Sequence, residues 1–171
     1  FWLLAAVVFL LPIFVLPFVV SPVASSKAAL LYFGVLVSAF LWLLATLKSG
    51  QIKIPKSFLL AVLAAVVLVW LFASLFSSNV VISLIGKVYD VDTFSIIAFV
   101  ALLLFLSATL FQSEKRIFTF YFLLFISSFF LFLFQFLHVV FKIDIIPVKI
   151  FQSVISNPLG SWNDFAVFFG F

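Results

Sequence analysis

The chain lacks cysteine, which excludes disulfide bonds, thiolate catalysis and thiolate metal ligands. Charge is also scarce: nine Lys or Arg and five Asp or Glu make up 8% of the residues, against roughly 25% in soluble globular domains. Methionine is absent even at position 1, and the chain begins inside an apolar run. These absences favour a fragment of a membrane protein over a soluble domain.

Long apolar runs occupy most of the sequence, and 68% of its residues are hydrophobic. A bilayer core of ~30 Å needs about 20 apolar residues of helix to cross it. The charge-free runs accommodate five such helices, and a sixth opens after Asp164 and is cut off at Phe171. We therefore predict an all-α, polytopic transmembrane helix bundle, a single domain fragment over 1–171 that is truncated at both ends. Its predicted spans are about 1–20, 28–47, 58–76, 94–112 and 117–141, with a truncated sixth at 165–171.

Charged residues in the gaps predict the topology, because basic residues in short loops mark the cytoplasmic face. The gap 48–57 carries three lysines and no acid, and the gap 113–116 carries two basic residues and one acid. We place both in the cytoplasm and the segments 77–93 and 142–164 outside. The amino-terminus is then cytoplasmic.

Two features of the apolar runs predict their shape. Pro12 and Pro17 would kink the first span, which is too long, and too poor in basic residues at its start, for a secretory signal peptide. The gap 113–116 is so short that the spans on either side are expected to form an antiparallel hairpin.

The external segments carry local structure of their own. The segment 77–93 is partly apolar, which favours a piece lying in the membrane interface. Residues 149–156 have the spacing of a short amphipathic helix on the membrane surface. Asn157-Pro158-Leu159-Gly160 predicts a β-turn, and Ser161 with Asp164 has the spacing of a capping box that opens the sixth span.

Ser128, Gln135 and His138 form a polar stripe in the fifth span, because separations of seven and three place them on one helix face. Such a stripe normally faces the bundle interior, where interhelical hydrogen bonds satisfy it. A proton or substrate pathway is the functional alternative. His138 is the only histidine, so we expect no metal site, and no motif for a cofactor, a phosphate or a catalytic nucleophile is present.

The order of elements resembles the amino-terminal half of the O-antigen ligase and O-antigen polymerase superfamily of bacterial inner-membrane glycosyltransferases. Four features carry the resemblance: a proline-bearing first span followed by Lys27, the serine-ended third span, an external Ser-Leu-Ile-Gly, and the segment that opens span six. The last three read Leu71-Phe72-Ala73-Ser74-Leu75-Phe76-Ser77-Ser78-Asn79, Ser83-Leu84-Ile85-Gly86 and Gly160-Ser161-Trp162-Asn163-Asp164-Phe165. Many members carry Gly-x-x-Asn-Pro-Asn-like sequence there, whereas this chain has Asp164 in place of the proline and lacks the following asparagine.

The resemblance implies transfer of a polyprenyl-diphosphate-linked glycan to an acceptor on the external face of the bacterial cytoplasmic membrane, as in polysaccharide or lipopolysaccharide biosynthesis. It implies no cofactor, metal or nucleic acid, and it implies catalytic basic residues and a histidine in a later external loop, beyond Phe171. Within this chain, Trp162, Asn163 and Asp164 are candidates for the rim of the substrate site, with helix capping as their alternative role.

Two other classes of function stay open on the sequence alone. One is a multi-span transporter or flippase for a lipid or small solute, and the other is a non-catalytic membrane scaffold. The spans contain no charged residue, which disfavours an ion-coupled transporter.

Overall fold

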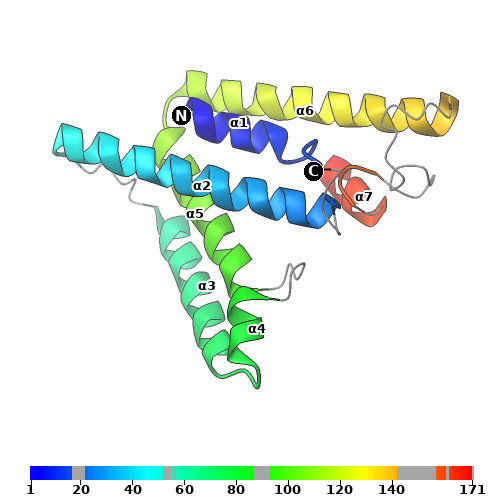
Figure 1. The fold of residues 1–171 in the computed structure, drawn as a ribbon. Coiled ribbons are helices and arrows are strands. Elements are labelled where there is room, and N and C mark those ends of the chain that lie inside the picture. The colour runs from blue at the N-terminus through cyan, green and yellow to red at the C-terminus, as the bar shows by residue number, and fades with distance from the viewer. Residues whose placement is uncertain are drawn as a thin grey trace.

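The computed structural model contains seven helices, and no named strand, within the residues that it describes (Figure 1). The helices are α1 (Trp2–Leu10), α2 (Pro22–Ser49), α3 (Phe58–Leu75), α4 (Val80–Ile85), α5 (Phe94–Leu110), α6 (Glu114–Phe141) and α7 (Trp162–Gly170). The described residues are 1–16, 22–51, 55, 57–86, 93–141, 157–160 and 162–170. The predicted surface helix at 149–156 lies outside them.

Three described helices are long and apolar enough to cross a membrane: Val23–Ser49, Phe58–Leu75 and Glu114–Phe141. The all-helical membrane fold is therefore as expected, but the prediction of five complete spans is wrong. The 17 residues of α5 rise about 26 Å, less than the ~30 Å bilayer core. The nine residues of α1 rise about 14 Å.

The first predicted span stops early because of Pro12. This residue has no amide hydrogen to continue the helix, and the amides of Ile13 and Phe14 both donate to the Leu10 carbonyl oxygen, at 3.0 and 2.7 Å. A tight turn over residues 11–13 replaces the expected kinked helix. Where the start of a sixth span was predicted, the structure has the nine-residue helix α7, which is too short to cross a bilayer, so this part of the prediction is not supported.

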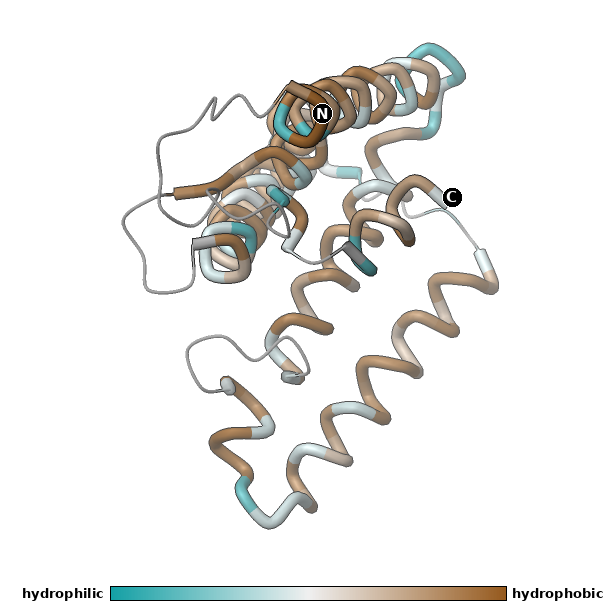
Figure 2. The backbone as a smooth tube through the Cα atoms, turned by 90° about the vertical axis from the view of Figure 1, so that its right-hand side faces the viewer, coloured by the Kyte–Doolittle hydropathy of each residue, from teal (hydrophilic) through white to brown (hydrophobic). Residues whose placement is uncertain are grey.

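The helices are arranged in two groups (Figure 1). In the first group, α1 lies between α2 and α6 and packs against both. In the second, α3 and α5 pack together and leave the first group at a steep angle, with α5 also contacting α2. Figure 2 shows apolar residues along nearly the full length of the long helices.

The predicted antiparallel hairpin of spans four and five is wrong. In the described residues, α6 packs against α1, while α5 packs against α2 and α3. The chain turns a corner instead, and at this corner the Arg116 guanidinium donates to the Leu110 carbonyl oxygen at 3.0 Å. The rings of Phe111 and Phe120 meet edge to face across this corner, with centroids 4.9 Å apart.

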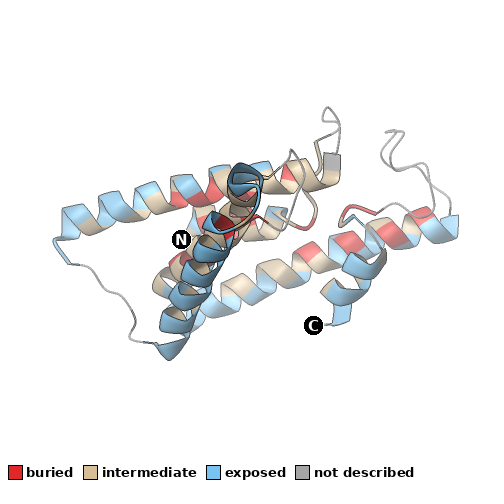
Figure 3. Ribbon diagram, turned by 90° about the horizontal axis from the view of Figure 1, so that it is seen from below, coloured by how far each residue is buried: buried red, intermediate tan, exposed pale blue. Residues whose placement is uncertain are grey.

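The core forms where α1, α2 and α5 meet. Leu4, Leu31, Val35 and Leu106 are buried there. Figure 3 shows the buried positions concentrated on the facing sides of α1, α2 and α6, with α3 largely exposed. The exposed side chains of α3 are mostly apolar, as expected for a helix that crosses a membrane.

Hydroxyl groups join helices within this apolar setting. The Ser77 and Ser83 hydroxyls lie 2.6 Å apart and hold α4 against the end of α3. The Tyr32 and Ser95 hydroxyls lie 3.2 Å apart and link α2 to α5. The serine-ended span and the Ser-Leu-Ile-Gly segment, noted separately in the sequence, are thus in direct contact.

Candidate functional site

Helix α7 lies between the amino-terminal end of α2 and the carboxyl-terminal half of α6 (Figure 1). On one side, a Cβ added at Gly160, just before α7, would lie 3.9 Å from a methyl group of Val23 in α2. On the other side, the Phe169 ring meets the Phe132 ring of α6 edge to face at 6.4 Å. Three segments far apart in the sequence therefore meet at one end of the bundle, and we call this region the α2–α6–α7 end.

The turn before α7 confirms the predicted β-turn. The Gly160 amide donates to the Asn157 carbonyl oxygen at 3.1 Å. The Asn157 Oδ1 atom accepts from the amides of Leu159 and Gly160, at 3.0 and 2.9 Å, and the side chain is 1% exposed. Gly160 has φ +126°, a backbone conformation that L side chains rarely adopt. The turn thereby fixes where α7 begins.

Lys27 and Asp164 place opposite charges at this end. Lys27 lies in the first turns of α2 and is partly buried, and the Asp164 carboxylate on α7 attracts its ammonium group. Asp164 is in the first turn of α7, where the helix dipole favours a negative charge. Next to Lys27, the buried Ser26 hydroxyl accepts the Leu16 amide at 2.8 Å and anchors the approach to α2.

The inward face of α6 carries three buried polar side chains. The exposed fraction is 0% for Ser127, 4% for Gln135 and 7% for His138. The Ser127 hydroxyl donates to the Phe9 carbonyl oxygen of α1 at 2.9 Å. Ser128 is only partly buried, and its hydroxyl donates to the Leu124 carbonyl oxygen of its own helix at 2.8 Å. The buried face is centred nearer to Leu131 than to Ser128, so Ser128 lies at its edge.

Two carboxamides keep unused hydrogen-bonding capacity. Among the residues that the structure describes, no hydrogen-bond partner is found for either polar atom of the buried Gln135 side chain or for Asn157 Nδ2. His138 lies one helical turn beyond Phe134, and their rings stack with centroids 6.4 Å apart. Because a buried polar group without a partner is costly, a polar ligand would gain by meeting these amides.

The three predicted rim residues all fall in the first turn of α7. Asn163 and Asp164 are exposed, and Trp162 begins the helix, although its side chain lies outside the described part. The structure places Asp164 within electrostatic range of Lys27, a residue that the sequence singled out only through the family resemblance. Ser127 was also missed, because its neighbour Ser128 fits the spacing to Gln135 better. Within the described residues, no group of three or more His, Cys, Asp or Glu could hold a metal ion.

Comparison with known proteins gives no relative: no protein-family model, curated protein or solved structure matches the chain. The resemblance to the O-antigen ligase and polymerase superfamily therefore stays a prediction that depends on the residues quoted above.

Proposed function

We propose that the chain is the membrane-embedded part of a glycosyltransferase of the O-antigen ligase or polymerase type. It would bind a polyprenyl-diphosphate-linked glycan at the α2–α6–α7 end, on the external face of a bacterial cytoplasmic membrane. The observation that carries this proposal is the convergence of Lys27, Asp164 and the polar face of α6 at one end of the helices.

Lys27 supplies the charge that such a substrate requires. A diphosphate leaving group develops negative charge, and an ammonium fixed beside it stabilises that charge. The Asp164 carboxylate attracts this ammonium group electrostatically. On binding, the diphosphate would replace Asp164 as the partner of Lys27.

The buried carboxamides suit the saccharide. Gln135 and Asn157 carry buried hydrogen-bonding atoms without a partner in the described part of the protein, and a sugar that reached them would present hydroxyl groups that both donate and accept. The family resemblance assigns no catalytic role to a residue of this chain. The described residues therefore serve substrate binding.

Substrate binding by purified protein in lipid nanodiscs tests the proposal. We expect Lys27→Gln to weaken binding of polyprenyl diphosphate at least about tenfold, since a hydrogen bond to a charged group contributes about 1.5–3 kcal/mol. Lys48→Gln is the matched control, because Lys48 is exposed at the opposite end of the same helix. Equal affinities of the two variants would contradict the proposal.

For the Asp164→Asn variant we predict the opposite change in affinity for polyprenyl diphosphate. Removing the carboxylate releases Lys27 and removes a negative charge near the ligand. Polyprenyl diphosphate should therefore bind several-fold more tightly than to the unmodified protein, and the gain should vanish in the Lys27→Gln background. Titration of all four proteins under the same salt concentration measures both effects.

A transporter or flippase is the second candidate, because one specific observation favours it. Gln135 keeps an unpaired amide inside a helix that is long enough to span, and polar groups at such positions mark substrate pathways. Reconstituted liposomes discriminate the two candidates. Loss of lipid translocation in Gln135→Leu, with unchanged affinity for the diphosphate, would favour transport.

A further inference from the structure

Helix α4 turns back beside the end of α3 (Figure 1, Figure 2). The polar turn Ser77-Ser78-Asn79 separates the two helices, and beyond it α4 packs against both α3 and α5. The hydroxyl of Ser74, in the last turn of α3, donates to the Ser83 carbonyl oxygen at 3.4 Å. The middle of α4 therefore lies level with the last turn of α3.

That level corresponds to a depth in the membrane, because α3 is long and apolar enough to cross it. The 18 residues of α3 rise about 27 Å, close to the ~30 Å thickness of the bilayer core. When such a helix spans the core, its last turn, which carries Ser74, lies at the edge of the hydrocarbon. The turn Ser77-Ser78-Asn79 then reaches the headgroups, and α4 runs from them back toward the acyl chains.

The exposed surface of α4 is apolar. Val81 and Ile85, one helical turn apart, are 72% and 71% exposed, whereas Ser83 and Leu84 are half-buried. The sequence from Phe58 to Gly86 contains no charged residue. Since water is a poor solvent for branched apolar side chains, this surface is better matched by lipid.

The polar groups of α4 find partners within the protein, as entry into lipid requires. The Ser77 and Ser83 hydroxyls lie 2.6 Å apart, so each serves the other in place of water. The Ser83 amide donates to the Asn79 carbonyl oxygen at 3.0 Å, and the Gly86 amide donates to the Ile82 carbonyl oxygen at 2.8 Å. These bonds lower the cost of placing α4 among acyl chains.

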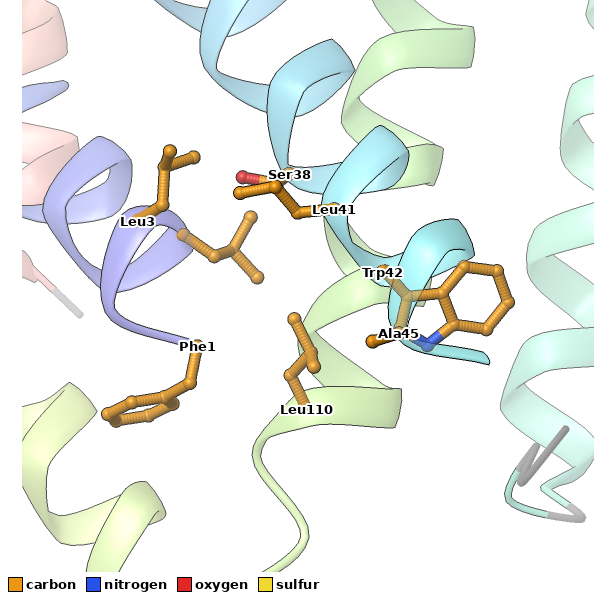
Figure 4. A pocket seen from close by; sticks show the side chains of 8 residues that line it. Phe1, Leu3, Ser38, Leu41, Trp42, Ala45 and Leu110 are labelled. Atoms are coloured by element: carbon orange, nitrogen blue, oxygen red, sulfur yellow. The ribbon is translucent and has the colours of Figure 1, made fainter. Parts of the chain in front are cut away.

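We propose that α4 is a re-entrant segment that inserts Val81 and Ile85 into the acyl chains of one leaflet, at the carboxyl-terminal end of α3. The partner of this surface is lipid. The surface is distinct from the α2–α6–α7 end and from the hollow that lies among α1, α2 and α5 (Figure 4). The proposal is therefore independent of the proposed glycosyltransferase function.

Nitroxide labels on single cysteines test the insertion, since the chain has no native cysteine. The labelled protein is placed in vesicles of phosphatidylcholine and phosphatidylglycerol. Labels at Val81→Cys and Ile85→Cys should collide often with oxygen, which concentrates in acyl chains, and rarely with a water-soluble nickel chelate. Val69→Cys, where the native side chain of α3 is 66% exposed, is the lipid reference, and Ser78→Cys in the polar turn is the water reference.

The direction of α4 gives the sharper expectation. The rate of collision with the nickel chelate should fall several-fold from Ser78 to Val81 and fall again at Ile85. Because four helical residues rise about 6 Å, the Ile85 label should lie deeper than the Val81 label by up to that distance. A segment that ran outward from α3 would give the reverse order.

The two collision rates also identify any other partner. Rare collision of the Val81 and Ile85 labels with both oxygen and nickel would show that protein covers them, whether a second copy or another segment of the chain, and would overturn the proposal. Frequent collision of the Ile85 label with nickel, or an Ile85 label shallower than the Val81 label, would overturn it as well. So would a Val69 label exposed to nickel, because α3 would then not cross the membrane.

Discussion

At the scale of single residues, close approach and hydrogen bonding decide how these apolar helices pack. In lipid, apolar side chains gain little by leaving their surroundings, so small residues and interhelical hydrogen bonds contribute much of the specificity. Gly34 allows a close approach of α2 to α1, and Ser127 forms a hydrogen bond from α6 to α1, so substitutions at these two positions measure the two effects separately.

Ser127→Ala should lower the free energy of unfolding by about 0.5–1.5 kcal/mol, because it removes the bond from α6 to the Phe9 carbonyl oxygen. Ser128→Ala is the control, since its hydroxyl bonds within α6. Denaturant titration in mixed micelles measures both variants. Equal losses would show that the Ser127 bond does not join the two helices.

Gly34→Ala should destabilise the contact of α1 with α2. A Cβ at this position would overlap a methyl group of Val7, so that side chain must shift. Val7→Ala makes room, and the double variant should recover most of the loss in a double-mutant cycle. Gly170→Ala, where a Cβ meets nothing within 4 Å, is the control and should leave stability unchanged. Additive losses from Gly34→Ala and Val7→Ala would contradict the contact.

At the scale of elements, helix length separates the spans from the other helices. Helices α2, α3 and α6 are long enough to cross a bilayer, whereas α1 and α7 have nine residues each. If α2 crosses the membrane, its two ends lie on opposite sides.

Cysteine labelling tests this placement, and the chain has no native cysteine to interfere. Gln51→Cys follows the carboxyl-terminal end of α2, and Leu159→Cys lies in the turn packed near its amino-terminal end. A membrane-impermeant maleimide should label the two variants from opposite sides in oriented vesicles. Labelling from the same side would exclude α2 as a span.

At the scale of the whole molecule, the pairing of helices departs from their order in the sequence. Helix α6 packs against α1, while α5 packs against α2 and α3 (Figure 1). This pairing brings the end of α6 to α7 and thereby assembles the α2–α6–α7 end.

Oxidative crosslinking distinguishes this arrangement from a hairpin. Cysteines at Phe9 and Ser127 should crosslink readily, because the Ser127 hydroxyl bonds the Phe9 carbonyl oxygen. Cysteines at Leu103 and Leu124 would face each other in an antiparallel hairpin of α5 and α6 and should not crosslink here. Gel mobility after oxidation measures the extent of crosslinking in both pairs. Crosslinking of the second pair and not of the first would support a hairpin of α5 and α6.

The sequence determined the all-helical membrane fold, because the length and apolarity of a run decide whether a helix can cross lipid. It also determined the turn at Asn157–Gly160, since proline and glycine restrict the backbone locally. Only the tertiary structure decided that α6 packs against α1 and not against α5, and that Asp164 lies within electrostatic range of Lys27. These outcomes depend on contacts between residues far apart in the chain, and apolar runs of nearly uniform composition carry little information about which helix will be the neighbour.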